Sequence, residues 1–349
     1  MRPLLQFLLI LATAGLVVLT FLSLSDTNLW WVRMTDFPRL QYAIALVALL
    51  VLLALARTAG GRLRAGLAVA ALAALGWNAV KLAPYLPQDR ARAPACAPGD
   101  RLTVMVANVK RENRRAEALL ALVRARAPDL LLALETNGWW DERLAPLSGP
   151  MPHTLAEISA DHFGMHLFSA LPLEASRTVY PAAQDAPAIL TDVRLRGGGA
   201  VRLIALHPRP PHPGQDAAGR DGQLMWAALE ARESERPALL AGDFNAVPWE
   251  RTVERAQRVG GLLDPREVEG FLATYDANSW WMAWPLDQAL HQPGLSLVSL
   301  TVLPGFGSDH YPLEAELCLG EAGRRPPALR EGDLAAAEAA LEAARENGG

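Results

Sequence analysis

Three long apolar stretches occupy the first 86 residues and limit what the rest of the chain can be. They run from Leu4 to about Leu24, from Leu40 to about Ala56 and from Ala65 to about Tyr85. Each is close to the length that an α-helix needs to cross about 30 Å of hydrocarbon. A cleaved signal peptide is the alternative for the first stretch, but no clear small-residue cleavage site follows it. Because two more stretches follow, we predict three transmembrane helices.

Basic residues between the second and third stretches indicate an orientation. The segment Arg57–Arg64 carries three arginines and no acidic residue, and short positive loops stay on the cytoplasmic side. Trp30 and Trp31, after the first stretch, are typical of a membrane interface. That outer loop also holds Arg33 and Arg39, which two acidic residues offset. We predict that the chain beyond about residue 87 lies outside the cytoplasmic membrane.

Pattern and composition divide the remaining chain into three parts. Residues 87–100 are rich in proline and alanine without periodicity, which predicts a tether. Residues 101–320 contain strand and helix patterns and predict one folded domain, whereas residues 321–349 are polar and predict a tail with one short helix. Two cysteines exclude a cysteine-rich scaffold or a thiolate zinc cluster. The net charge of -4 gives the whole molecule no general attraction for nucleic acid.

The most informative stretch of the folded domain is Leu239–Trp249, which reads Leu-Leu-Ala-Gly-Asp-Phe-Asn-Ala-Val-Pro-Trp. Its apolar run predicts a buried strand that ends by presenting Asp243 and Asn245. Residues two apart in an extended chain point the same way, so both side chains could face one point. An Asx turn that closes a strand explains the pair at least as well.

Polar residues also end the other apolar strands. Asn108, Glu135 and His207 each follow such a run, and Asp309 and His310 precede the strand Leu313–Leu319. If that last strand is antiparallel to the others, its start lies at the same edge of the sheet as their ends. Oxygen ligands would suit Mg²⁺ there, and imidazole and amide groups would suit charge that develops on phosphate. An acid beside a histidine also suits a base that deprotonates water.

Two further segments leave alternatives open. Asp161, His162 and His166 fit a metal site, but a glycine-broken strand with partly exposed histidines is the favoured interpretation. The segment with Trp280, Trp281 and Trp284 fits either lipid contact or ordinary core packing.

Taken together, the order of these motifs resembles the endonuclease/exonuclease/phosphatase superfamily, the Mg²⁺-dependent DNase-I-like hydrolases, over about residues 101–319. The resemblance implies an α/β fold, a four-layer α-β-β-α sandwich. It also implies the following roles: Glu135 as the principal Mg²⁺ ligand (Mn²⁺ being an alternative ion) with Asn108 beside it, His207 and Asn245 on the phosphate, Asp243 on the nucleophile or leaving group, and Asp309 with His310 as a polarised pair.

Several features look closer to a membrane-anchored bacterial branch that includes glycopeptide (teicoplanin) resistance proteins. These are the leading spans, His-Pro-x-Pro-Pro and Asn-Ala-Val-Pro-Trp. The branch implies a multi-pass protein of the bacterial inner membrane that hydrolyses lipid-linked phosphates on the periplasmic or extracellular side. Where the branch tends to read Ile-Asp-His, this chain reads Leu286-Asp287-Gln288. Asp287 is then expected to orient a site histidine, and the role of its neighbour is in doubt.

The leading functional hypothesis is therefore an outward-facing phosphohydrolase acting on a phosphorylated lipid or another phosphoester near the membrane. A tethered nuclease or phosphodiesterase acting on DNA or RNA is the alternative, and a non-catalytic membrane scaffold is the third. No protein partner is inferred. If the first and last strands of the domain pair antiparallel, as the resemblance implies, Cys96 and Cys318 lie close enough for a disulfide in an oxidising compartment.

Overall fold

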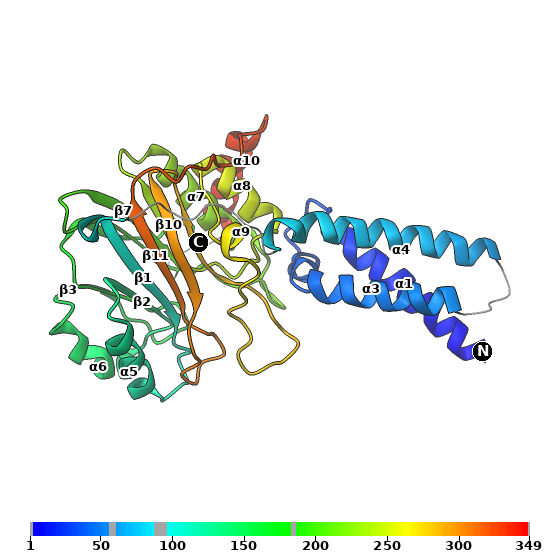
Figure 1. Ribbon diagram of the computed structural model, residues 1–349, viewed down its shortest axis with the longest axis horizontal. Helices are drawn as coiled ribbons and strands as arrows, with labels where there is room; N and C mark the ends of the chain where they lie inside the picture. Colours follow the sequence, from blue (N-terminus) through cyan, green and yellow to red (C-terminus); the bar gives the residue numbers. More distant parts are fainter. Residues whose placement is uncertain (1–2, 56–60, 87–95, 183–185, 348–349) are drawn as a thin grey trace. The chain divides into compact units, whose positions relative to one another are not determined.

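The computed structural model describes residues 3–55, 61–86, 96–182 and 186–347, and it contains two compact units (Figure 1). One unit comprises Met1–Leu86 with Pro211–Asp216, and the other comprises the rest of the chain. Residues 57–60 of the predicted cytoplasmic loop and residues 87–95 of the predicted tether lie outside the described residues.

The first unit is made mainly of long apolar helices. Its elements are α1 (Pro3–Leu22), α2 (Trp30–Arg33), η1 (Met34–Asp36), α3 (Arg39–Leu55), α4 (Gly61–Leu82) and η2 (Ala83–Tyr85).

By length and composition, the stretches Leu4–Leu22 and Gly61–Tyr85 could each cross a membrane. A third candidate exists only if Trp30–Asp36 and Arg39–Leu55, which meet at a bend of 70°, are taken as one span. Pro38 lies at this bend and lacks the N–H that a continuous helix requires. The predicted second span, Leu40 to about Ala56, nearly coincides with α3, which by itself is shorter than the other two candidate spans.

A buried polar cluster joins the long helices of this unit. The Arg39 guanidinium donates to Asp36, to Ser23 and to the side-chain oxygen of Asn78. Asn78 in turn donates to Thr20 of α1 at 3.2 Å. Polar groups in an apolar surrounding are costly unless they are paired, so this cluster fixes how α1, α3 and α4 pack against one another.

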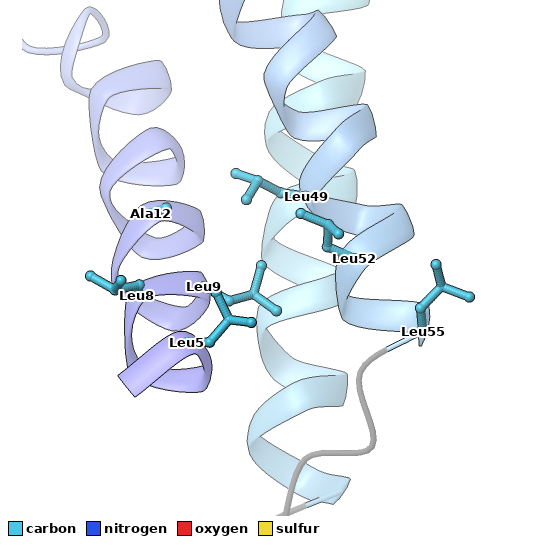
Figure 2. A pocket seen from close by; sticks show the side chains of 7 residues that line it. All are labelled: Leu5, Leu8, Leu9, Ala12, Leu49, Leu52 and Leu55. Carbon is cyan, nitrogen blue, oxygen red and sulfur yellow. The ribbon is translucent and has the colours of Figure 1, made fainter. Parts of the chain in front are cut away.

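A pocket of about 330 Å³ lies between α1 and α3 (Figure 2). Its lining is aliphatic throughout: Leu5, Leu8, Leu9, Ala12, Leu49, Leu52 and Leu55. Such a surface is matched to hydrocarbon rather than to a polar ligand.

The second unit contains two β-sheets. The strands of the first sheet are β1 (Arg101–Asn108), β2 (Leu130–Leu134), β3 (His153–Glu157), β4 (Met165–Ser169), β10 (Leu295–Val302) and β11 (Leu313–Leu319). Those of the second are β5 (Leu173–Val179), β6 (Ala188–Arg194), β7 (Ala200–Leu206), β8 (Ala238–Asp243) and β9 (Asp287–His291). Their orders are β10-β11-β1-β2-β4-β3 and β5-β6-β7-β8-β9. Both sheets are mixed, because β1 is parallel to β2 and β7 to β8 while the other neighbours are antiparallel.

The main hydrophobic core lies between the two sheets. Leu102, Val104 and Val106 of β1 point into it, together with Leu203 of β7 and Leu239 of β8. The intervening β1 residues, Met105 and Ala107, belong to a different cluster on the outer face. The alternation of side chains along this strand, which the sequence pattern predicted, is thus confirmed.

Helices cover the outer faces of both sheets. The first sheet packs against α5 (Ala116–Arg126) and α6 (Gly138–Leu144), and the second against α7 (Ala218–Glu233), α8 (Arg251–Gly260) and α10 (Asp333–Asn347). The short helices η3 (Pro98–Asp100), η4 (Ala145–Ser148) and α9 (Arg266–Glu269) complete the unit. The C-terminal segment was expected to be a polar tail with one short helix, but Ala337 and Leu341 of α10 are part of the core.

Candidate functional site

Strand pairing brings the polar strand ends of each sheet to one edge. Asn108 of β1 lies opposite Leu134 of parallel β2, directly before Glu135. Antiparallel β11 begins opposite the end of β1, with Leu313 paired to Val106. In the second sheet, Asp243 of β8 pairs with Asp287 of β9. These registers confirm the prediction that the polar residues at the strand ends lie at one edge of each sheet.

Asp243 is the point at which the two sheets meet. The Asn108 side-chain amide donates to Asp243 Oδ2 at 3.1 Å and to Glu135 Oε1 at 3.0 Å, so one residue bridges both sheets. Two imidazoles also face Asp243 Oδ2, with Nε2 of His310 at 3.5 Å and Nε2 of His207 at 3.8 Å. Residues from β1, β2, β7, β8 and the segment before β11 therefore converge within a few ångströms.

Steric contacts determine the backbone conformation of the Gly-Asp-Phe-Asn run at the end of β8. Gly242 has φ of 147°, and a Cβ added there would lie 1.8 Å from the backbone oxygen of Leu206. Only glycine permits this approach of β8 to the end of β7. Asn245 adopts φ of 49°, and its backbone N–H donates to Asp243 Oδ1 at 2.9 Å. The Asx turn weighed from the sequence is present, and it holds the carboxylate that faces the site.

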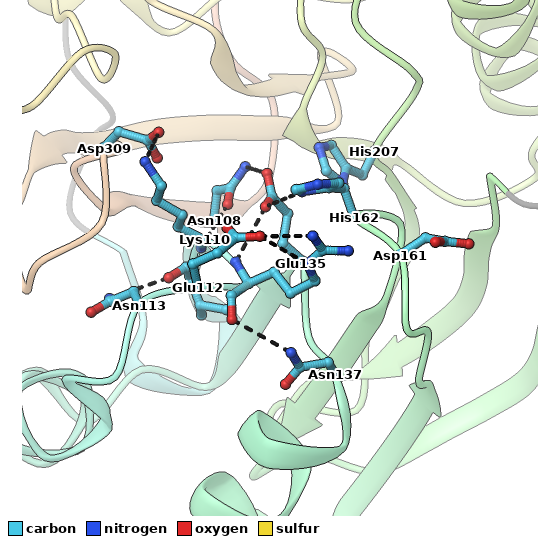
Figure 3. A network of polar contacts seen from close by, with 12 residues as sticks. Asn108, Lys110, Glu112, Asn113, Glu135, Asn137, Asp161, His162, His207 and Asp309 are labelled. Carbon is cyan, nitrogen blue, oxygen red and sulfur yellow. Dashed lines mark hydrogen bonds and ion pairs between the residues drawn. The ribbon is translucent and has the colours of Figure 1, made fainter.

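Glu135 lies in a second group of polar side chains (Figure 3). Its carboxylate accepts hydrogen bonds from Asn108 and from the backbone N–H of Arg111, and it contacts Nδ1 of His162 at 3.1 Å. One ligand atom from each of Glu112, Glu135 and His162 lies within 4.8 Å of the others. Glu135 has φ of 61°, an unusual conformation for a residue with a side chain and one that tends to persist at functional sites.

The acid that pairs with His310 is Asp287, not Asp309. Asp287 Oδ2 lies 2.8 Å from Nδ1 of His310, and both side chains are buried. Burial disfavours the imidazolium, but Asp287 and Asp243 outweigh this and raise the pKa of His310 to about 10. The expected pair of Asp309 and His310 is therefore corrected, whereas the expectation that Asp287 orients a site histidine agrees with the geometry. A histidine that is charged at neutral pH is a poor base for water.

Asp309 instead forms an ion pair with Lys110, whose Nζ lies 2.8 Å from its Oδ2. The hydrogen bond to Asp309 raises the pKa of Lys110 further. Ser308, the preceding residue, donates to the backbone oxygen of Asn108 at 2.7 Å and accepts from the N–H of His310. The Ser-Asp-His run is thereby joined to the end of β1.

Two expected phosphate contacts are placed differently from one another. His207 is buried near Asp243, and its Nδ1 has no hydrogen-bond partner among the described residues. The Asn245 side chain, in contrast, donates to the backbone oxygen of Pro208 at 3.0 Å. A contact between Asn245 and phosphate would require this bond to be exchanged, and its role stays a prediction.

The metal interpretation of Asp161, His162 and His166 is not reproduced as a group. His166 is buried in β4 and stacks on Phe168 at 3.8 Å, and burial lowers its pKa to about 4. The favoured alternative of partly exposed histidines is thus wrong for His166. His162 is exposed and contacts Glu135, so His162 belongs to the site. The sequence pattern had not predicted that these two residues lie close together.

Gln288, the departure from the branch pattern, is structural. It is buried, its side-chain oxygen accepts from Arg266 at 2.9 Å, and its amide donates to the backbone oxygen of Pro285 at 2.7 Å. Separately, the structure joins Cys96 and Cys318 in a disulfide with a Cα–Cα distance of 5.8 Å.

Lys110, Glu112 and Ser308 were not predicted as site residues. Lys110 and Glu112 lie two and four residues after Asn108, at the end of a strand. Their charge close to a strand end could have indicated that they belong to the site. Nothing in the pattern distinguished these two from the arginines that surround them.

The family model described as the endonuclease/exonuclease/phosphatase family matches residues 105–310, which is more than half of the chain. The chain belongs to this family. It is accordingly a phosphoester hydrolase by family, with a carboxylate and histidine cluster of metal-ligand spacing. No curated protein matches the chain.

Solved structures share the fold at low sequence identity. TDP2 from D. rerio, complexed with a single strand DNA product, is 16% identical, with a TM-score of 0.54 over 62% of this chain and 98% of that one. The human Nocturnin catalytic domain with a bound sulfate anion is 19% identical, with a TM-score of 0.51 over 65% and 97%. An endonuclease/exonuclease/phosphatase from Beutenbergia cavernae is 20% identical, with a TM-score of 0.52 over 67% and 76%. The second unit therefore has an α/β DNase-I-like fold.

The metal-ligating side chains around Glu135 fit a divalent cation. Glu112 and Glu135 offer carboxylate oxygens, which suit Mg²⁺, Ca²⁺ or Mn²⁺, and His162 adds one imidazole nitrogen. Asp243, Asp287 and His310 also lie within 4.8 Å of one another. There, however, the imidazolium of His310 lies between the two carboxylates and offsets one of their two negative charges.

Proposed function

We propose that this chain is a membrane-anchored, Mg²⁺-dependent hydrolase that removes phosphate from a phosphorylated lipid. The observation that carries the proposal is the bridge from Glu135 through Asn108 to Asp243, with His207 and His310 facing the same Asp243 oxygen. This arrangement combines a carboxylate for a metal with cationic and hydrogen-bonding groups for phosphate. The apolar helices of the first unit favour a substrate that lies in a membrane.

In the proposal, Glu135 holds the Mg²⁺ ion with Asn108 beside it, and Glu112 and His162 are close enough to assist. Bound Mg²⁺ would polarise the phosphoryl oxygens and neutralise negative charge on them. Mn²⁺ has similar ligand preferences and is expected to substitute.

The other side chains would act on the reacting groups directly. His310, kept cationic by Asp287 and Asp243, stabilises charge that develops on the phosphoryl oxygens. Asp243 would orient the attacking water and accept a proton from it while the water oxygen bonds to phosphorus; the bond between phosphorus and the lipid oxygen breaks, and that oxygen takes up a proton to leave as an alcohol. Lys110, held by Asp309, adds a second positive charge beside this centre.

The four-layer description of the catalytic domain and the division at residues 86, 100 and 320 are part of the proposal, although helix α10 of the last segment packs into the core of the catalytic unit. So is an outward location of the catalytic domain, on the periplasmic or extracellular side of a bacterial inner membrane. The disulfide between Cys96 and Cys318 supports that location, because disulfides persist in oxidising compartments. The proposed similarity to the teicoplanin-resistance branch rests on the sequence motifs alone.

A tethered nuclease is the second candidate. The fold is shared with D. rerio TDP2, which was solved with a single strand DNA product. The net charge of -4 favours the lipid substrate, because nucleic-acid binding depends mainly on contacts between basic residues and phosphates.

The test is phosphate release by the full chain in lipid nanodiscs, with and without Mg²⁺. The panel contains a polyprenyl phosphate, a diester phospholipid and single-stranded DNA. We expect Mg²⁺-dependent release from the polyprenyl phosphate. Cleavage of DNA without turnover of either lipid would establish the nuclease instead, and inactivity on all three without Mg²⁺ binding would support a scaffold.

A further inference from the structure

An aromatic surface leads away from the candidate catalytic centre. The Tyr275 ring lies 4.9 Å from the His310 ring and stacks on Trp284 at 5.8 Å, measured between ring centroids. Tyr275 and Trp284 are half-buried, so part of each side chain is accessible. Trp284 is therefore partly packed, whereas Trp280 and Trp281 are exposed, and the lipid-contact interpretation of this segment stays a prediction.

The tip of this segment carries the most exposed large apolar side chain of the second unit. Trp280 is 94% exposed and Trp281 is 51% exposed. Both belong to a loop, residues 273–286, that connects α9 to β9 and that we call the aromatic loop. A tryptophan ring that is almost fully exposed leaves a large apolar surface in water, and burial of such a surface is favourable. Its position therefore indicates an apolar contact.

The aromatic loop is held in place at its base. The Asp276 N–H donates to the Met282 oxygen at 2.7 Å, and Tyr275 and Trp284 form a β-bridge. The Ala277 N–H donates to the backbone oxygen of Asp309 at 2.7 Å. Since Asp309 precedes His310, the loop is hydrogen-bonded directly to the segment that carries the candidate site.

The charge of the loop identifies its ligand. The aromatic loop, residues 273–286, contains one acidic residue, Asp276, and no lysine, arginine or histidine. Surfaces that stack single-stranded nucleic acid combine aromatic rings with a positively charged groove that follows the phosphates. This loop has the rings without the positive charge, so its chemistry suits a hydrocarbon chain rather than a series of bases.

We propose that the aromatic loop binds the hydrocarbon chain of the phosphorylated lipid whose phosphate lies at Asp243. This inference rests on the proposed function and adds a specificity element to it. The rings of Tyr275 and Trp284 would contact the part of the chain nearest the phosphate, and Trp280 would contact the part farther away.

The experiment compares phosphate release from butyl phosphate and from decyl phosphate by the full chain in nanodiscs. The wild type is expected to have the higher kcat/KM on decyl phosphate. Trp280→Ser should lower that kcat/KM about tenfold and leave butyl phosphate unchanged, as expected for loss of one buried aromatic contact. Trp280→Phe should restore most of the loss. Leu329→Ser, which changes an exposed apolar residue of the C-terminal segment, is the matched control and should affect neither substrate.

An equal effect of Trp280→Ser on both phosphates, or on neither, would overturn the inference. So would an unchanged preference for decyl phosphate combined with a loss of single-stranded DNA cleavage, because that would assign the loop to bases. Binding of decyl phosphate, followed by tryptophan fluorescence, separates this test from the proposed function. If the wild type released no phosphate, the proposed function would fail, yet weaker binding by Trp280→Ser would still support the apolar contact.

Discussion

Glu135 is the residue on which the proposed metal site depends most. Glu135→Gln keeps the size of the side chain and one oxygen acceptor for Asn108 but removes the negative charge that a divalent cation requires. We expect a loss of at least about 10²-fold in kcat, with a change in the free energy of unfolding below about 1 kcal/mol. Phosphate release and thermal unfolding measure the two quantities. Glu112→Gln, on the exposed side of the same group, is the control and should lose less activity; a large loss of stability in Glu135→Gln would instead make the residue structural.

His310 should make folding stability depend on pH in the alkaline range. Its pKa is about 10, raised from 6.5, so the folded state binds the proton more tightly than the unfolded state. The resulting stabilisation is complete below about pH 6.5 and is lost as pH rises through about 10. His310→Gln should be less stable at pH 7 by about 3–5 kcal/mol, because two buried carboxylates lose their cation. Chemical unfolding from pH 6 to 10 should show a falling stability in the wild type and a flatter profile in the variant; identical slopes would refute the charged pair.

Ionised Asp264, which lies before helix α9, should lower the stability of the fold at neutral pH, whereas charged His310 raises it. It is buried, one oxygen accepts from the Arg266 N–H at 2.8 Å, and burial raises its pKa to about 6. A carboxyl with a raised pKa stabilises the fold fully below about pH 3.8, and that contribution is lost as pH rises through about 6. Asp264→Asn should therefore be more stable than the wild type at pH 8, by no more than about 3 kcal/mol. A difference that did not shrink towards pH 4 would show that another effect is responsible.

At the level of elements, the turn after β8 depends on one glycine. Gly242→Ala would place a methyl group 1.8 Å from the Leu206 oxygen, so β7 and β8 would have to separate where Asp243 is presented. We expect a loss of more than about 3 kcal/mol or failure to fold. Gly138→Ala, where the added methyl meets nothing within 4 Å, is the control and should change stability by less than about 1 kcal/mol. Circular dichroism during denaturation measures both.

The sequence predicted those elements that carry a clear local pattern. Periodicity located β1, β11 and α10 well, because alternation and helical spacing are local properties. Convergence of Asn108, Glu135 and Asp243 followed from strand direction. The partner of His310 did not follow from the strand pattern, because Asp287 is 23 residues distant and only the pairing of β9 with β8 brings it near; the family resemblance alone indicated that Asp287 orients a site histidine. His162 was likewise hidden, since its contact with Glu135 depends on the loop before β4.

At the level of the whole molecule, the disulfide closes most of the catalytic unit into one loop. Cys96 and Cys318 are 222 residues apart, and the chain-entropy model gives a stabilisation of about 5 kcal/mol for a loop of this length. Cys318→Ser should lower the melting temperature clearly, and reducing agent should lower that of the wild type to the same value without further effect on the variant. An unchanged melting temperature under reducing conditions would mean that the bond does not form in the protein.

Side chains from both sheets meet at one catalytic centre, and in the proposed function Glu135 holds its divalent cation. Calorimetric titration of the full chain with Mg²⁺, alongside phosphate release at the same Mg²⁺ concentrations, tests it most directly. We predict one Mg²⁺ per chain, a parallel rise of binding and turnover, and loss of both in Glu135→Gln. Full turnover by the wild type in the presence of a strong chelator, or undiminished Mg²⁺ binding by Glu135→Gln, would contradict the claim.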